Sequence, residues 1–533
     1  MTDHPNFLFI ITDQQRADYL GCTGHPVLRT PHIDSIAARG RRFDRFYVAN
    51  PVCMPNRATL VTGRMPSVHG VRSNGIPLSA RANTFLEVLR LQGWRTALIG
   101  KSHLQNMTEH AAVQKRPAPA PGRKAPPAGY EEAWKDPYGD WDYGQEHPSR
   151  WQAEAPLALR LPFYGYEHVD LCTGHGDQVG GHYYQWLRTQ TPDADALRDP
   201  KNQLAHGYTC PQAVRTAVPE ELYPTRWVTD RALDWLDAHA KSERDTPFFA
   251  MVAYPDPHHP FTPPGKYWDL YDPADMSPPA SFGERNRKVP PTVEWLRARR
   301  ADGSAVLDSQ TPFSIEEGEL REAMALTCGM IAMIDDGVGA LLARLEALGL
   351  AESTVVVFTA DHGDFMGDHG IVLKGPIHYE SITRVPFLWA DTPDRARPGA
   401  SAALCGTVDI AATVLDRAGL EPYWGMQGRS LLGLAAGDAD EDADVLIEED
   451  SQRAELGFDS PPRITTLVTR DWRLSVYDGV AWGELYSLAD DPLELDNRWD
   501  DPGCAGIKGE LFERMARKRM ALVDRSPLPT GRA

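Results

Sequence analysis

The chain has 533 residues, of which 42% are hydrophobic and 24% charged, the proportions of a soluble globular protein. This length allows a large core and predicts two units, one large and one small. The formal net charge of −19 argues against nucleic-acid binding and against adhesion to anionic membranes, so an anionic ligand would need a locally positive pocket.

The cysteines and the N-terminal residues bear on the compartment. The seven cysteines are scattered, odd in number and without a Cys-x-x-Cys pair, which predicts a reduced, intracellular protein. The first residues lack the basic region of a signal peptide, and the apolar stretch 7–11 is too short for its hydrophobic segment. No stretch is expected to reach the length of a membrane span. We therefore expect a cytoplasmic protein.

Strands and helices alternate along most of the chain. The apolar runs typical of buried strands are 6–11, 95–99, 247–254, 354–359 and 384–389. Predicted helices run from Thr30 to Gly40, Cys53 to Gly63 and Thr84 to Gly93, and over 227–240, 314–348 and 408–418. This alternation predicts an α/β fold with a largely parallel sheet covered by helices.

The regular pattern breaks down between residues 106 and 225, a stretch rich in Pro, Gly, Tyr, Trp and His. So long a stretch inside a regular domain is usually functional or disordered, and the aromatic content favours packing. We predict an insertion that shapes access to a substrate.

A second unit is expected at the C-terminal end. The large unit, residues 1–437, is followed by an acidic run over 438–444. Alternating segments at 464–469, 472–477 and 485–487 predict a small antiparallel sheet, with a helix at 511–523. Residues 438–533 therefore form the predicted C-terminal subdomain.

Cys53 marks the most distinctive segment, Val52-Cys-Met-Pro-Asn-Arg-Ala-Thr-Leu-Val-Thr-Gly-Arg64. Pro55 favours the first turn of a helix, so Cys53 should lie at or just before a helix N-terminus, where unpaired N–H groups favour an anion. Arg57, about one turn further on, can point back toward the same place. A buried structural cysteine would fit equally well, and the Cys-x-Pro-x-Arg pattern alone is only suggestive.

Reactive side chains follow four different predicted strands. Ligands of parallel sheets bind beyond the carboxyl ends of the strands, so these side chains should converge. Each of them alone has an ordinary structural explanation, such as a turn cap or a solvated charge; their coincidence favours a functional site. They are Asp13 with Gln14, Lys101 with His103, His258, and Asp361 with His362.

Four of these residues could hold a metal ion. Asp13, Gln14, Asp361 and His362 offer carboxylate and amide oxygens and an imidazole. Such an oxygen-dominated set suits Ca²⁺, Mg²⁺ or Mn²⁺, whereas a thiolate set for zinc is lacking, and the imidazole slightly favours Mn²⁺. Gln15 could replace Gln14.

Cys53-Met-Pro-Asn-Arg57, followed by Thr62-Gly63-Arg64 and His69-Gly70, resembles the signature of the sulfatases of the alkaline phosphatase superfamily. The resemblance implies a large mixed, mostly parallel sheet sandwiched by helices, with a small C-terminal antiparallel sheet. Further matches recur in order along nearly the whole chain. They are Asp13-Gln14, Gly100-Lys-Ser-His103, Asp256-Pro-His-His-Pro-Phe261, Ile334-Asp-Asp336, Thr359-Ala-Asp-His-Gly363, Lys374, Arg384-Val-Pro386, Glu484-Leu-Tyr486 and Asp490-Asp-Pro492.

In this family the cysteine is oxidised enzymatically to formylglycine, whose hydrate is the nucleophile. The resemblance thus implies hydrolysis of aryl or alkyl sulfate esters, a formylglycine-generating enzyme as partner, and a homo-oligomer. It also implies one divalent ion, Ca²⁺ in the first place and Mn²⁺ or Mg²⁺ as alternatives, held by residue 53 with Asp13, Gln14, Asp361 and His362.

The resemblance also assigns the remaining site residues. Arg57 and Lys101 would orient the hydrate. Lys374 and His258 would bind the sulfuryl oxygens, with His258 protonating the leaving oxygen. His103 would deprotonate the second hydroxyl and so expel sulfate, and Asn74 would contact the anion.

Two features leave the preferred ester open. Gln14 and His362 resemble the phosphonate monoester hydrolase branch, since many sulfatases have a second Asp and an Asn there. That branch lacks the pair formed here by Lys101 and His103. A phosphonate monoester or phosphodiester hydrolase is therefore the nearest alternative. A silent member that binds a sulfated ligand, with Cys53 still a thiol, is a third.

Overall fold

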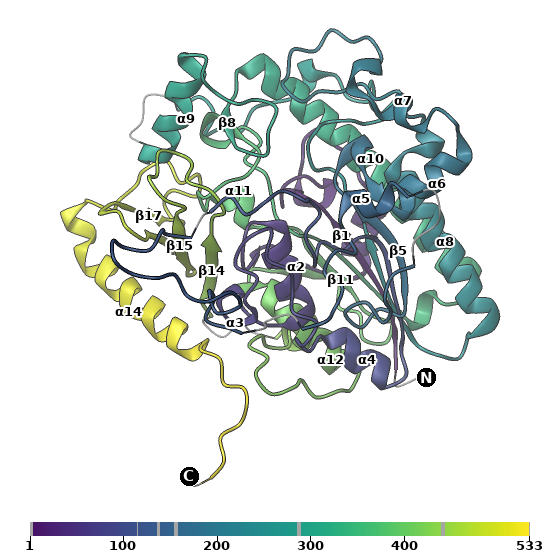
Figure 1. The fold of residues 1–533 in the computed structure, drawn as a ribbon. Helices are drawn as coiled ribbons and strands as arrows, with labels where there is room; N and C mark the ends of the chain where they lie inside the picture. Colours follow the sequence, from purple (N-terminus) through teal and green to yellow (C-terminus); the bar gives the residue numbers. More distant parts are fainter. Residues whose placement is uncertain are drawn as a thin grey trace.

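The computed structural model describes residues 4–114, 116–135, 139–153, 158–284, 289–438 and 443–531. A nine-stranded sheet forms its centre, in the order β12-β2-β11-β9-β1-β7-β4-β5-β6 (Figure 1). β1, β4, β5, β7 and β9 run parallel, whereas β11 and β6 run antiparallel to their neighbours β9 and β5. The bounds are β1 Asn6–Thr12, β2 Arg41–Phe43, β4 Arg95–Lys101, β5 His168–Thr173, β6 Gly180–Gly181, β7 Phe248–Ala253, β9 Thr354–Ala360, β11 Phe387–Ala390 and β12 Gly399–Ser401.

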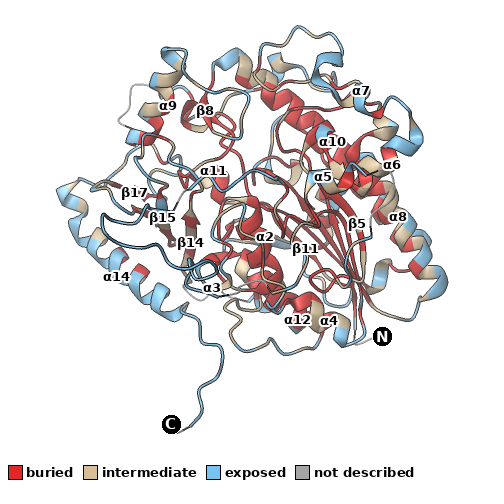
Figure 2. Cartoon of the chain, in the orientation of Figure 1, coloured by how far each residue is buried: buried red, intermediate tan, exposed pale blue. Residues whose placement is uncertain are grey.

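Helices cover both faces of this sheet. Successive residues of β1 point to opposite faces: Phe7 and Phe9 pack in a cluster with α2, α4 and α12, while Leu8 and Ile10 pack in one with α1, α8 and α10. Both faces are therefore buried, as Figure 2 shows by the buried central strands and the exposed outer side of α8. The bounds are α1 Pro31–Arg39, α2 Cys53–Thr62, α3 Pro66–His69, α4 Phe85–Leu91, α5 Pro148–Trp151, α6 His182–Gln190, α7 Ala194–Arg198, α8 Pro224–Ser242, α9 Pro291–Ala301, α10 Glu317–Ala347, α11 Glu380–Thr383, α12 Ile410–Arg417, α13 Leu432–Ala436 and α14 Ala505–Ala521.

The C-terminal part contains a second, four-stranded sheet. Its strands are antiparallel, in the order β14 (Val445–Asp450), β15 (Arg463–Val468), β16 (Trp472–Tyr477) and β17 (Gly483–Ser487). Leu511 and Met515 of α14 pack against apolar residues of these strands. Two small pairings, β8 (Phe313–Ser314) with β10 (Ile371–Val372) and β3 (Phe46–Tyr47) with β13 (Cys405–Gly406), complete the strands.

The predicted fold class is confirmed: a mostly parallel sheet between helices and a small antiparallel sheet at the C-terminal end. The predicted acidic boundary at 438–444 includes residues 439–442, which lie outside the described residues. The proposed division into two units stays a prediction.

Two expectations are wrong. The irregular stretch 106–225 contains β5, which joins the main sheet beside β4. The strand escaped recognition because His168 and Asp170 interrupt its apolar pattern, their side chains pairing at 2.9 Å on its partly exposed side. The other error concerns α10, which is long and apolar enough to span a membrane by length and composition. However, 83% of its most apolar stretch is buried inside the protein, as in a core helix.

Candidate active site

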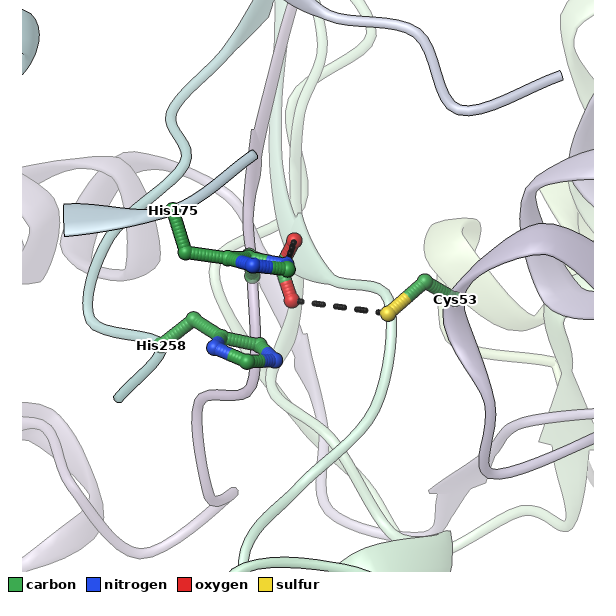
Figure 3. Close-up of side chains that lie close together, drawn as sticks. Cys53, His175 and His258 are labelled. Atoms are coloured by element: carbon green, nitrogen blue, oxygen red, sulfur yellow. Dashed lines mark hydrogen bonds and ion pairs between the residues drawn. The ribbon is translucent and has the colours of Figure 1, made fainter. Parts of the chain in front are cut away.

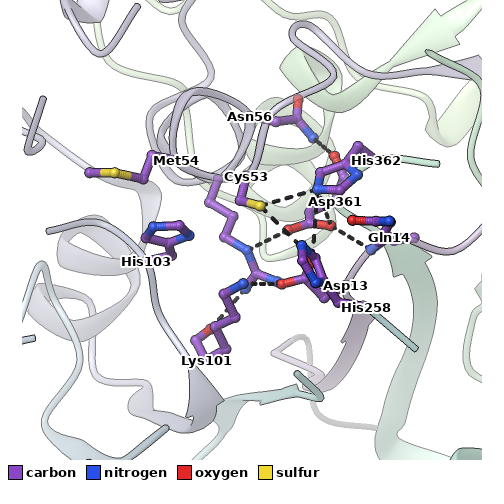
Figure 4. Close-up of polar contacts among 12 residues, drawn as sticks. Asp13, Gln14, Cys53, Met54, Asn56, Lys101, His103, His258, Asp361 and His362 are labelled. Atoms are coloured by element: carbon purple, nitrogen blue, oxygen red, sulfur yellow. Dashed lines mark hydrogen bonds and ion pairs between the residues drawn. The ribbon is translucent and has the colours of Figure 1, made fainter. Parts of the chain in front are cut away.

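The predicted convergence occurs at one end of the main sheet. Asp13 follows β1, Lys101 ends β4, His258 lies beyond β7, and Asp361 follows β9. All four are fully buried. Figure 4 shows their side chains gathered around the first turn of α2, although they come from distant parts of the sequence.

Cys53 is the first residue of α2, as its sequence context predicts. Its Sγ atom lies 3.1 Å from Nε2 of His362 and 3.9 Å from Oδ1 of Asp13. Burial and the negative charge of Asp13 raise the pKa of the Cys53 thiol to about 11. An unmodified thiol would therefore stay protonated at neutral pH and be a weak nucleophile.

Asn56 fixes the start of this helix to the end of β9. Its Nδ2 donates to the carbonyl oxygen of Asp361 at 2.6 Å, while its Oδ1 accepts from the backbone N–H of Ala49 at 3.0 Å. Asn74 approaches from the following loop, and its Oδ1 accepts from the backbone N–H of Met54 at 3.1 Å. The first turn of α2 thus has a fixed position relative to the strand ends.

Two overlapping sets of donor atoms could hold a divalent ion, and the set with two carboxylates contains predicted ligands. Single ligand atoms of Asp13, Cys53, Asp361 and His362 all lie within 4.8 Å of one another. Nε2 of His362 is 3.6 Å from a carboxylate oxygen of each aspartate. Nδ1 of His362 lies 2.9 Å from the carbonyl oxygen of Gly363, which leaves Nε2 for the site.

The two adjacent glutamines point in different directions. Oε1 of Gln14 faces the site and accepts from Nζ of Lys374 at 2.6 Å. Gln15 turns away: its Oε1 accepts from the Thr12 hydroxyl and its Nε2 donates to the carbonyl oxygen of Tyr19. Gln14, in the left-handed backbone region with φ 62°, is therefore the one that faces the donor set.

Three cationic side chains lie at the site, and two of them contact its carboxylates. Nε of Arg57 lies 2.8 Å from Oδ2 of Asp361, and its Nη2 lies 3.6 Å from Oδ2 of Asp13. Nζ of Lys101 donates to Asp13, and Nζ of Lys374 lies 2.7 Å from Nε2 of His258. Although burial opposes ionisation, Lys101 and its neighbouring cations hold the pKa of Asp13 well below its usual range. The net-negative chain thus has the local positive site that an anionic ligand needs.

A family model described as sulfatase matches residues 5–420, which is most of this sequence. The chain belongs to the sulfatase family. A second family model, described as the C-terminal part of N-sulphoglucosamine sulphohydrolase, matches residues 367–521. Membership makes the chain a sulfuric ester hydrolase.

Relatives of this sulfatase cover it almost completely. It is 28% identical over 502 residues to an arylsulfatase of Clostridium perfringens, covering 92% of this chain and 90% of that one. It is 26% identical over 549 residues to the multifunctional alkaline phosphatase superfamily protein PehA of Trinickia caryophylli, with 98% and 96% covered. The solved phosphonate monoester hydrolase of Agrobacterium radiobacter superposes with a TM-score of 0.74 at 24% identity, covering 98% and 97% of the two chains. The chain therefore has the same fold as this phosphonate monoester hydrolase.

His103 lies beside the proposed metal-binding residues, close to Met54 (Figure 4). Its backbone is in the left-handed region, with φ 54°, and its N–H donates to Oε2 of Glu146 at 3.0 Å. Nδ1 of His103 is buried without a hydrogen-bond partner among the described residues. Burial and the neighbouring cations hold the pKa of His103 well below its usual range, so the imidazole is neutral.

Two residues near the sulfatase site were not predicted. His175 follows β5 and contacts Lys101 and His258. Glu146 accepts the backbone N–H groups of three successive residues after β4, His103, Leu104 and Gln105. Recognition of β5 would have pointed to His175, whereas no sequence pattern marks Glu146.

Proposed function

We propose that this sulfatase hydrolyses small aryl or alkyl sulfate monoesters, using formylglycine made from Cys53 and one divalent ion. The observation that carries the proposal is the meeting of Cys53 with Asp13, Asp361 and His362 within 4.8 Å. Cys53 lies at the start of a helix, beside two carboxylates and near several cationic side chains. An anionic ester could bind there next to a nucleophile at residue 53.

The ion would be held by Asp13, Gln14, Asp361 and His362 together with residue 53. The donor set is hard and rich in oxygen, which favours Ca²⁺ first and leaves Mn²⁺ and Mg²⁺ as alternatives. Such an ion supplies Lewis acidity, which lowers the pKa of a hydroxyl at residue 53 and draws charge from the ester oxygens.

Conversion of Cys53 would need a partner, a formylglycine-generating enzyme, in the proposed cytoplasmic compartment. The raised pKa of the Cys53 thiol supports this modification, because a protonated thiol attacks sulfur poorly. A hydrated aldehyde offers two hydroxyls. One would attack sulfur, and loss of the proton from the other would later release sulfate as the aldehyde re-forms.

The chain's own residues would carry the protons. Nδ1 of His258 is bonded to the carbonyl oxygen of His259, so its Nε2 faces Nζ of Lys374 at 2.7 Å. The Lys374 ammonium donates in this contact, so the proton that the pair would deliver to the leaving oxygen comes from Lys374 through Nε2 of His258, as the ester S–O bond breaks. His103 would accept the proton of the second hydroxyl, while Arg57 and Lys101 orient residue 53.

The second candidate is a phosphonate monoester or phosphodiester hydrolase with the same apparatus. Gln14 supports this candidate, because a glutamine at this position resembles the phosphonate monoester hydrolase branch and its Oε1 lies in the site, bonded to Lys374. These esters present a similar anionic tetrahedral centre, so one site could act on both classes.

One comparison of substrates tests the proposal. Protein co-produced with a formylglycine-generating enzyme should show a higher kcat/KM for 4-nitrophenyl sulfate than for 4-nitrophenyl phenylphosphonate. Cys53→Ala should abolish both activities. A preference for the phosphonate would favour the second candidate, and turnover by Cys53→Ala would contradict the role of residue 53.

A further inference from the structure

His175 contacts two proposed site residues that follow different strands, Lys101 and His258. It lies directly after β5, in the segment Gly174-His175-Gly176. Its ring stacks on that of His258, with ring centroids 3.5 Å apart and planes at 13°. Figure 3 shows the two rings face to face opposite Cys53.

The same imidazole also bonds to Lys101. Nε2 of His175 lies 2.7 Å from Nζ of Lys101, which additionally donates to Asp13. An ammonium has only donors, so Nε2 of His175 must accept and the ring proton lies on Nδ1. Two of the three N–H groups of Lys101 are thereby directed, and the third has little freedom.

The stacking restrains His258 from a further side. Its Nδ1 is bonded to the carbonyl oxygen of His259 and its Nε2 to Lys374, while His175 covers one face of the ring. The His175 side chain is 18% exposed, whereas His258 is fully buried. His175 therefore lies between solvent and the proposed proton donor.

We propose that His175 is a positioning residue of the hydrolytic site, aiming the Lys101 ammonium through Nε2 and holding the His258 ring by stacking. The proposal rests on the proposed function, because it needs His258 as proton donor to the leaving oxygen. A role as metal ligand fits less well: although His175 lies within reach of Asp13, Cys53 and His258, its Nε2 already faces an ammonium.

Two substitutions separate the two contacts. His175→Phe keeps an aromatic face for His258 but removes the acceptor for Lys101. His175→Gln keeps an amide acceptor but removes the ring. The matched control is His168→Gln, since His168 lies on β5, the strand that precedes His175, but pairs with Asp170, away from the site.

Each variant is assayed as matured, metal-loaded enzyme with 4-nitrophenyl sulfate and phenyl sulfate. Phenoxide is the more basic leaving group and depends more on a proton donor. His175→Gln should therefore lose kcat on phenyl sulfate about ten-fold more than on 4-nitrophenyl sulfate. His175→Phe should lose kcat on both esters equally, with little change in KM, and His168→Gln should match the wild type.

Three results would overturn the proposal: wild-type kinetics in both variants, equal losses on both esters in His175→Gln, or loss of bound metal in either variant. Metal content and the circular dichroism spectrum are measured on each preparation. If His175→Phe fails to fold, the ratio of the two esters in His175→Gln still decides. A wild-type enzyme inactive on both sulfates would instead refute the proposed function.

Discussion

Nε of Arg57 donates to Oδ2 of Asp361 at 2.8 Å, across 304 residues of chain. The same guanidinium donates through Nη1 to the carbonyl oxygen of Lys101 and approaches Asp13 through Nη2. One buried side chain of α2 is thus joined to the ends of three parallel strands. The helix that begins with Cys53 is therefore joined directly to the proposed metal ligands Asp13 and Asp361.

Asp361→Asn should lose bound metal and activity together while the fold persists. The amide removes a charge from the donor set, but Arg57 retains Asp13 as a partner. We expect kcat/KM to fall by about 10³-fold or more, as for loss of a main electrostatic element of a site. Metal analysis, kinetics and circular dichroism on the same preparation measure this.

The control for that change is Asp391→Asn, which removes a carboxylate paired with Arg417 at the same distance of 2.8 Å, outside the site. This variant should keep its metal and its activity. Full turnover by Asp361→Asn would exclude Asp361 from the site.

His103→Gln should stall the enzyme after the first chemical step. Glutamine cannot accept a proton, so release of sulfate from residue 53 should slow by about 10²–10⁴-fold. We expect a burst of phenol followed by a slow phase, and a sulfate adduct on the peptide that contains residue 53.

The matched variant is His69→Gln, because the His69 side chain is half-buried and bonds to the Thr59 hydroxyl, outside the proposed site. It should lower stability without producing a burst. A linear time course with His103→Gln, together with an unmodified peptide, would move His103 out of the second step.

Glu146 predicts a pH dependence of stability. Burial raises the pKa of this carboxyl from its ordinary value of 4.5 to about 7. The hydrogen bonds from the three backbone N–H groups lower the pKa, but by less than burial raises it. The folded chain therefore holds this proton more tightly than the unfolded chain. Its stabilising contribution is complete below pH 4.5 and is lost as the pH rises to 7, by about 3 kcal/mol.

Comparison with Glu146→Gln isolates that contribution, because glutamine does not titrate. The free energy of unfolding in urea, measured at several pH values, should fall more steeply between pH 4.5 and 7 for the wild type. Parallel curves for the two proteins would show that Glu146 is ionised throughout this range.

The convergence of Asp13, Lys101, His258 and Asp361 could be predicted because each lies at or beyond the end of a strand with a clear apolar run. β1 and β9 are buried along their whole length, so the sequence shows continuous apolar runs that end just before Asp13 and Asp361. The rule that parallel strands present their carboxyl ends together then sufficed to bring the side chains to one place. The formylglycine and the individual roles came from the family resemblance alone.

What could not be predicted depends on contacts that leave no local pattern. β5 carries polar residues at alternate positions on a partly exposed side, so its strand character, and with it the position of His175, was hidden. Glu146 acts through its carboxylate on backbone N–H groups some 40 residues earlier, as the separations of 41–43 residues show. Such long-range backbone capping has no sequence signature.

The mass of the peptide containing residue 53 tests the central claim most directly. It is measured on active protein co-produced with a formylglycine-generating enzyme, in parallel with its specific activity. We predict that the cysteine sulfur has been replaced by an aldehyde oxygen, and that activity rises in proportion to the converted fraction. Full sulfate ester hydrolysis by protein whose Cys53 is entirely an unmodified thiol would contradict the account.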